Sequence, residues 1–233
     1  MADKEINDLK EENVYLAHVD YETQRIQDAK THLQHVADFA YQNCPIQELL
    51  KVLAYLAGIM HDAGKLGEEN QKDFEKILES GDQVHKNGLD HSTAGGRLIQ
   101  ELVNVPIVTE MISTAIYFHH GVSDCIDLET GVSVQKQRRE KEIPYSLIEK
   151  RFKQTMDWES LEEQCPEILK SLKSIYDRID NFSKNCKWKQ MHCGDSHFFL
   201  GMYLRVLLSL LIDGDWTDTS SFLEGVPLKK RIS

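Results

Sequence analysis

Apolar residues along the chain recur at the spacing of α-helices. Between residues 24 and 42 they fall three or four positions apart, and therefore on one face of a helix. These residues are Ile26, Ala29, Leu33, Val36, Ala37 and Ala40. Residues 46–60 are apolar on most sides, which predicts a buried helix, and Gly64 suits a cap at its C-terminal end.

Further helices follow from the same spacing and from residues that begin or end helices. We expect helices over residues 71–79, 92–103, 106–119 and 195–218, and amphipathic stretches at 145–154 and 160–182. The sequence therefore predicts one mostly α domain over residues 1–233. Within it, residues 122–194 are expected to be a variable insertion of loops and surface helices, because their run QKQRREKE is typical of a solvated face.

Charge and composition narrow the function classes. The chain has 233 residues and a formal net charge of −11, which disfavours binding of free nucleic acid. A nucleic-acid role would need a local basic surface, a metal ion or a partner. The five cysteines show no disulfide spacing, the first residues are acidic and polar, and the longest apolar run contains Arg205. We therefore expect a cytoplasmic protein that has no membrane partner.

A set of histidines and aspartates lies on the predicted helices or beside their ends. The set comprises His32, His61, Asp62, His91, His119, His120 and Asp215. Each alone is compatible with a polar helix end, and His32 with a core histidine. Together, these imidazoles and carboxylates are typical ligands of manganese, iron, cobalt, nickel or zinc. Asp62 has two oxygens and can bridge two such ions about 3.5–4 Å apart.

Helical geometry separates the late aspartates. Asp213 and Asp215 are two positions apart and face different directions. Asp215 shares the face of Leu208 and Leu211, which we expect to point inward. Asp218 lies one turn later on that face, which makes it a candidate to orient a metal ligand.

Other residues have simpler structural interpretations. We expect Ser92 to begin a helix, His18 and His35 to be structural or to support metal ligands, and His85 to lie on the surface. A second cluster does not have the spacing of a familiar zinc finger, although Trp188 between lysines could stack on a base. Its members are Cys186, His192, Cys193 and His197.

Several short motifs follow one another in a fixed order. They are YLAH (15–18), HLQHVADFA (32–40), GIMHDAGK (58–65), DHSTAGG (90–96), AIYFHHG (115–121) and LLIDGDWTDT (210–219). This ordered set resembles the HD superfamily of metal-dependent phosphohydrolases. More closely, it resembles the HD nuclease of the type I CRISPR nuclease-helicase. The resemblance implies a helical bundle with a central dinuclear metal site.

The resemblance also implies roles for individual residues. One ion would take His32, His61, Asp62 and Asp215, and the second would share Asp62 and take His91, His119 and His120. Asp62 would be catalytic as the bridge between two divalent ions, which would be manganese, cobalt, nickel, iron or magnesium. Lys65 would be catalytic by placing a positive charge beside the scissile phosphate. Lys65 could instead be a cation that stabilises a helix C-terminus.

By this resemblance the protein would be a nuclease that cuts single-stranded DNA in CRISPR interference. Its expected partners are a helicase domain or subunit and an RNA-guided effector complex, since the sequence contains no GxxxxGK[ST] motif of its own. Two alternatives stay open. One is an HD nucleotide phosphohydrolase, such as a deoxynucleotide triphosphatase or a cyclic-nucleotide phosphodiesterase. The other is a non-catalytic interaction module.

Overall fold

Helices dominate the computed structural model, which describes residue 9 and residues 12–45, 48–81, 90–102, 106–121, 129–161, 163 and 194–228. The strands among these residues form one antiparallel hairpin, β1 (Leu16–Val19) with β2 (Ile26–Asp28). The prediction of a mostly α fold is confirmed. Over the described ranges, none of the helices combines the length and the apolar character that a membrane span requires.

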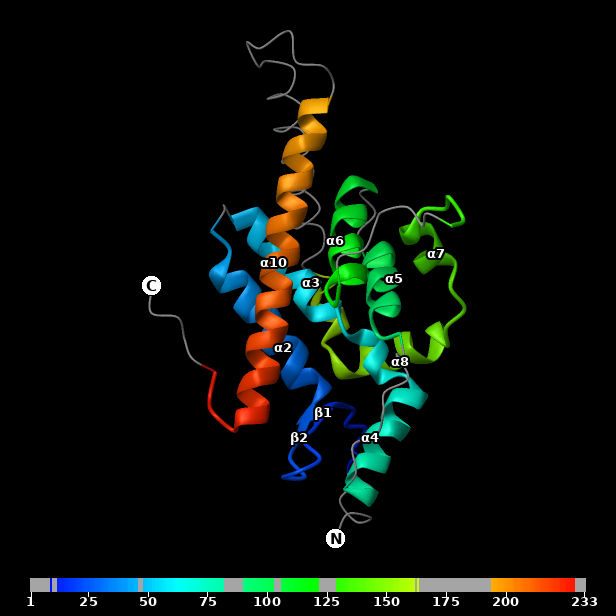
Figure 1. Ribbon diagram of the computed structural model, residues 1–233, viewed down its shortest axis with the longest axis vertical. Coiled ribbons are helices and arrows are strands. Elements are labelled where there is room, and N and C mark those ends of the chain that lie inside the picture. Colours follow the sequence, from blue (N-terminus) through cyan, green and yellow to red (C-terminus); the bar gives the residue numbers. More distant parts are fainter. Residues whose placement is uncertain are drawn as a thin grey trace.

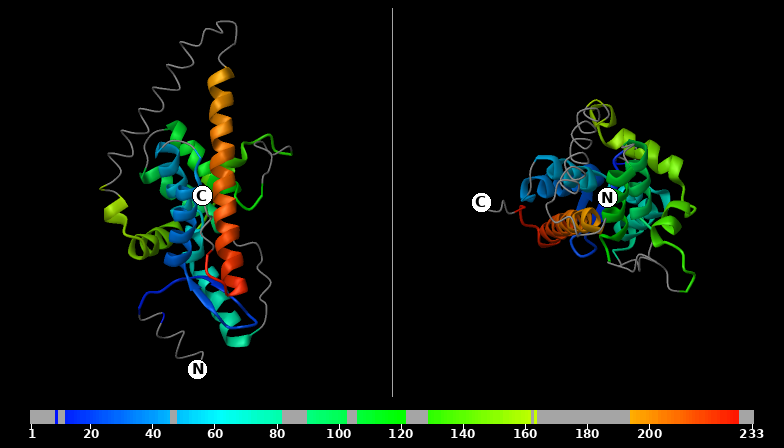
Figure 2. Two further views of the ribbon diagram at one scale, coloured as in Figure 1. Left: turned by 90° about the vertical axis from the view of Figure 1, so that its left-hand side faces the viewer. Right: turned by 90° about the horizontal axis from the view of Figure 1, so that it is seen from above.

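Five helices build the main core. They are α2 (Ala29–Asn43), α3 (Glu48–Met60), α5 (Ser92–Leu102), α6 (Pro106–Phe118) and the long α10 (Gly194–Glu224). Helix α10 packs against α2, α3 and α6, and α5 packs against α6 (Figure 1). Figure 2 shows α10 running along one side of the molecule. The fully buried core side chains come from all five helices and include Leu33, Leu56, Ile99, Ile116 and Leu211.

Shorter elements surround this core. They are the 3₁₀-helix η1 (Ala63–Leu66), α4 (Glu68–Ser80), α7 (Val134–Glu140) and α8 (Tyr145–Thr155). Helix α4 lies beside the hairpin (Figure 1), where Leu16, Phe74, Ile77 and Leu78 form a second, smaller apolar cluster. Helix α7 has no buried residue.

The first predicted helix begins later than expected. Residues 24–28 do not join it, since Ile26–Asp28 pair with β1 instead. The Asp28 side chain caps α2 by accepting a hydrogen bond from the Thr31 backbone N–H (2.8 Å). Ile26 still contributes to burial, but against the small cluster beside α4. The helical periodicity thus included one turn that a cap and a strand partner exclude.

Other boundaries differ by smaller amounts. Helix α4 begins three residues before the predicted start at position 71 and ends where expected, with Gly81 at φ +69°. The prediction for Gly64 is wrong: it lies in η1 and donates its N–H to the His91 carbonyl (2.9 Å). Helix α10 continues past residue 218 to Glu224. Most of 160–182, together with His85, Trp188 and the Cys186–His197 cluster, lies outside the described residues and side chains.

Asp90 holds the start of α5 against the segment that contains α7. Its carboxylate accepts hydrogen bonds from the Thr93 backbone N–H (3.0 Å), Lys141 Nζ (2.7 Å) and Arg138 Nη1 (3.1 Å). Burial alone would raise the pKa of Asp90, but these hydrogen bonds and the Arg138 charge hold it well below its ordinary value. The carboxylate therefore stays ionised at neutral pH.

We expect Asp90→Asn to lower the free energy of unfolding by about 1–3 kcal/mol at pH 7, because two cations lose their full partner. Since the folded-state pKa is depressed, this stabilisation is complete above the unfolded pKa of about 3.9 and disappears as the pH falls further. Urea unfolding of both proteins at a series of pH values measures the difference. Asp73→Asn is the control, since it removes only the largely exposed ion pair with Lys76 (3.1 Å). A difference that increases below pH 4 would contradict this account.

Candidate metal centre

The seven histidines and aspartates singled out from the sequence lie close together in the folded chain. They form two groups, and within each group one ligand atom per residue lies within 4.8 Å of all the others. The first group is His32, His61, Asp62 and Asp215, and the second is Asp62, His91, His119 and His120. These are the two ligand sets that the resemblance implied. They come from α2, the turn after α3, the residue before α5, the turn after α6 and the C-terminal third of α10.

Asp62 belongs to both groups and divides its two oxygens between them. Oδ2 lies 3.5 Å from Nε2 of both His32 and His61. Oδ1 faces the second group, at 3.3 Å from His119 Nε2 and 3.7 Å from Nε2 of both His91 and His120. Two ligands held about 2.1 Å from one ion at tetrahedral or octahedral angles are about 3.0–3.4 Å apart. The observed separations are close to this range on both sides of Asp62.

Backbone carbonyls orient two of the buried histidines, His61 and His119. Nδ1 of His61 bonds to the Gly58 carbonyl (2.8 Å), and Nδ1 of His119 bonds to the Ile116 carbonyl (2.6 Å). Both bonds join a residue to the carbonyl three positions earlier, at the end of α3 or α6. Because a carbonyl only accepts, each Nδ1 carries a proton, and in the neutral ring the lone pair is on Nε2. This is the tautomer that a metal-binding histidine needs.

The buried nitrogen atoms that face Asp62 lack partners. Nε2 of His32, His61 and His119 is inaccessible to solvent and has no hydrogen-bond partner among the described residues. An unpaired buried polar atom costs free energy, so several of them aimed at one carboxylate call for an additional group. A divalent cation satisfies them all at once. The residues present therefore fit a metal ion.

Asp215 completes the first group from α10. Its Oδ1 lies 3.5 Å from His32 Nε2 and 3.7 Å from His61 Nε2. The residue is buried at 7% exposure, whereas Asp213 is exposed on the other side of the same helix. Helical spacing alone therefore distinguishes the inward-facing aspartate from its neighbour.

Asp218 orients the His32 ring through Nδ1, the ring nitrogen that does not face Asp62. Its Oδ2 accepts from His32 Nδ1 (2.6 Å) and from Gln27 Nε2 (2.8 Å), and its Oδ1 accepts from His35 Nδ1 (2.7 Å). The ionised carboxylate fixes the His32 ring with Nε2 toward Asp62 and makes that nitrogen a stronger ligand. Asp218 thus orients His32, a member of the first group, and His35 and Gln27 in turn hold Asp218 in place. Nothing in the local sequence distinguished Gln27.

We expect Asp218→Asn to weaken metal binding in the first group by about 10- to 100-fold, because one oxygen becomes an amide that cannot accept from a histidine. Competition with a coloured chelator measures the affinity. Asp213→Asn is the matched control: it makes the same chemical change on the exposed side of α10. Equal affinities for the two variants would show that Asp218 does not orient His32.

Lys65 points into the centre. The residue is only 6% exposed, and its Nζ lies 2.6 Å from Asp62 Oδ2 and 3.1 Å from His18 Nε2. An ammonium group only donates, so His18 must be neutral and accept through Nε2. Burial lowers the pKa of His18 well below its ordinary value, which agrees with this state. Sequence reasoning did not find the contact between Lys65 and His18, although both belong to the motifs.

The protonation states suit cation binding. Burial would raise the pKa of Asp62, but Lys65, His61 and His91 hold it well below its ordinary value. Burial lowers the pKa of His91 to about 4 and also lowers that of His119. His61 differs, because Asp62 and Asp215 raise its pKa despite its burial. Protons therefore compete with an incoming metal ion more strongly at His61 than at His91 or His119.

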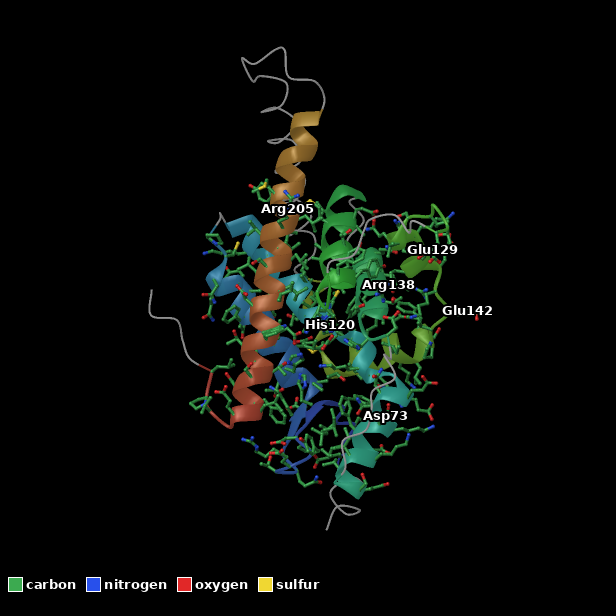
Figure 3. The ribbon with its side chains drawn as sticks, in the orientation of Figure 1. Asp73, His120, Glu129, Arg138, Glu142 and Arg205 are labelled. Carbon is green, nitrogen blue, oxygen red and sulfur yellow. The ribbon has the colours of Figure 1, made fainter. Side chains whose placement is uncertain are left out.

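The two groups differ in access. His32, His61 and Asp62 are at most 1% exposed, so the first group is enclosed. In the second group, 48% of the His120 side chain and 27% of the His91 side chain are exposed. Figure 3 labels His120 near the middle of the molecule. The centre is therefore open to solvent on the side of the second group.

Gly64 brings η1 against His91 more closely than any other residue could. A Cβ at Gly64 would lie 2.5 Å from both the Cα and the carbonyl oxygen of His91. Because these are backbone atoms, Gly64→Ala should displace His91 and lose the metal ion of the second group, with a stability cost of about 1–3 kcal/mol. Metal analysis after dialysis and thermal unfolding measure both effects. Gly121→Ala beside His120 is the control, since nothing lies within 4 Å of its added Cβ. Unchanged metal content in Gly64→Ala would disprove this role.

Comparison with known proteins agrees with this geometry. A family model described as the HD domain matches residues 30–181, which is more than half of the chain. The matched residues include every predicted ligand except Asp215, which the fold supplies from α10. A comparison with curated proteins returns no significant match. The helical architecture, the two His/Asp groups and the family match together show that the chain belongs to the HD domain family of metal-dependent phosphohydrolases.

Proposed function

We propose that the protein is a two-metal nuclease that hydrolyses phosphodiester bonds in single-stranded DNA. The observation that carries this proposal is the division of Asp62, whose Oδ2 faces the buried group and whose Oδ1 faces the solvent-accessible group. A shared carboxylate of this kind is how two-metal phosphoester hydrolases hold their ions.

The residues have distinct tasks in such a reaction. His32, His61 and Asp215 would hold an enclosed ion with Asp62, and His91, His119 and His120 would hold an accessible one. Divalent ions supply activation of water and neutralisation of charge on the phosphate. Lys65 Nζ lies beside Asp62 Oδ2 and can stabilise added negative charge in the transition state. His120, which is half exposed, lies on the side where a phosphodiester arrives.

The exposure of the second group favours a polymeric substrate. A strand continues on both sides of the scissile phosphate and so needs an open approach, which His91 and His120 provide. The motifs DHSTAGG and AIYFHHG, which contribute these residues, are also those that resemble the CRISPR nuclease. The proposal therefore includes delivery of the strand by a helicase domain or subunit that acts with an RNA-guided effector complex.

A metal-by-substrate screen tests the proposal. The wild-type protein is incubated with manganese, cobalt, nickel, iron or magnesium ions and with circular single-stranded DNA, deoxynucleoside triphosphates or cyclic nucleotides. We expect cleavage of the circle and intact nucleotides. Asp62→Asn should be inactive, and Asp213→Asn, on the exposed face of α10, should match the wild type.

Two results would contradict the proposal. Release of triphosphate from nucleotides with intact DNA would identify a nucleotide triphosphohydrolase built on the same ligand groups. Opening of cyclic nucleotides with intact DNA would identify a small-molecule phosphodiesterase.

A further inference from the structure

Positive side chains gather on α7, on the residue after it and on the adjoining face of α5. This basic surface consists of Arg97, Lys136, Arg138, Arg139 and Lys141. The segment 134–142 holds four cations and two carboxylates, in a chain whose net charge is −11. Helix α7 has no buried residue, so its cationic side chains stay at least partly accessible to solvent.

Ion pairs fix this surface to the helices that carry the second metal group. Lys141 Nζ (2.7 Å) and Arg138 Nη1 (3.1 Å) both contact Asp90 Oδ2, and Arg97 donates to the Lys141 carbonyl. Arg139 contacts Glu110 on α6 at 3.0 Å. Asp90 carries one negative charge and faces two cations, so its ion pairs leave an uncompensated positive charge.

The basic surface therefore borders the accessible side of the metal centre. Asp90 is the residue immediately before His91, whose Nε2 lies 3.7 Å from Asp62 Oδ1 and beside His120 Nε2. Figure 3 labels Arg138 and His120, which this chain of contacts connects. Arg138 and Lys141 thus contact the residue next to His91, a member of the second group.

We propose that the basic surface binds the sugar–phosphate backbone of the substrate strand next to the scissile phosphate. This inference rests on the proposed nuclease function and assigns its strand-binding surface. Helix α7 is about 10 Å long, which is enough to contact more than one phosphate of a strand. Lys136 and Arg139 are the cations best placed to exchange partners, because their ion pairs are exposed to solvent. Lys136 Nζ lies 3.8 Å from Glu140, which is too far for a hydrogen bond, and Arg139 pairs with the half-exposed Glu110.

The test uses the double variant Lys136→Gln/Arg139→Gln, which leaves both ion pairs to Asp90 in place. Binding of the metal-loaded protein to a fluorescent single strand with phosphorothioate linkages, which resist cleavage, is measured by anisotropy at several salt concentrations. We expect an affinity about tenfold weaker at 0.1 M salt, and a plot of log K against log salt whose slope is smaller by about 1.4. The charge-conserving variant Lys136→Arg/Arg139→Lys should bind like the wild type. Lys30→Gln/Lys76→Gln, which removes two exposed lysines on α2 and α4, should also bind like the wild type.

A second readout separates this inference from the proposed function. Hydrolysis of bis(4-nitrophenyl) phosphate, a phosphodiester without a strand, should be the same in the wild type and in Lys136→Gln/Arg139→Gln. On DNA, the double variant should raise KM and leave kcat unchanged. Equal strand affinity and equal salt slope in the double variant would overturn the inference even if the wild type cuts DNA. Absence of strand binding by the wild type would overturn it as well, whereas failure to cleave a strand that is bound would contradict only the nuclease proposal.

Discussion

Asp62→Asn is expected to abolish hydrolysis and to empty both metal groups. An asparagine offers one oxygen where two groups each need one, and it removes the negative charge that the Lys65 ammonium contacts at 2.6 Å. Losing either ion of a two-metal site removes stabilisation made in the transition state, so the rate should fall on the order of 10³-fold or more. Metal content after dialysis and the rate on bis(4-nitrophenyl) phosphate are the measurements.

The control for this prediction is a variant that changes charge without touching the centre. Asp213→Asn lies on the exposed side of α10 and should keep both metal content and rate. Circular dichroism of both variants shows whether the helices persist. An Asp62→Asn protein that keeps its ions and a rate within tenfold of wild type would show that Asp62 is not the bridge.

Metal binding is expected to stabilise the fold strongly. The Nε2 atoms of His32, His61 and His119 are buried and unpaired within the described structure, so an ion satisfies groups that otherwise destabilise the folded state. At a free metal concentration of 100 times Kd, the gain is about 2.7 kcal/mol, which corresponds to about 5–10 °C in Tm for a chain of this size. Thermal unfolding with excess chelator and with added manganese measures the shift.

Variants and pH make this second prediction specific. Asp215→Asn should weaken the contribution of the first group and His120→Gln that of the second, and Asp62→Asn should show no metal-dependent shift. Asp62 and Asp215 raise the pKa of His61 despite its burial, so protons compete with the metal ion at this histidine as the pH falls. The shift in Tm should therefore be smaller at pH 6 than at pH 8. A shift of equal size in wild type and Asp62→Asn would mean that the ion binds elsewhere.

Local pattern predicted the helical elements because burial of one helix face imposes a period on the sequence. The same pattern overextended the first helix, because apolar periodicity does not register the cap at Asp28 or the pairing of Ile26 with Val19 in β1. It also assigned Gly64 to a helix cap, whereas the close approach of His91 determines that position. Both errors concern contacts between segments that no local period encodes.

For the metal centre, the sequence by itself determined which residue types are available and on which helical faces they lie. It singled out Asp215 over Asp213 because two positions along a helix turn a side chain to another direction. Tertiary structure decided the rest: the division of the Asp62 oxygens, the support of His32 by Asp218 and Gln27, the inward direction of Lys65 and the attachment of α7 to Asp90. The physical reason is that hydrogen bonds and ion pairs act over a few ångströms, and only the packing of helices brings distant segments that close.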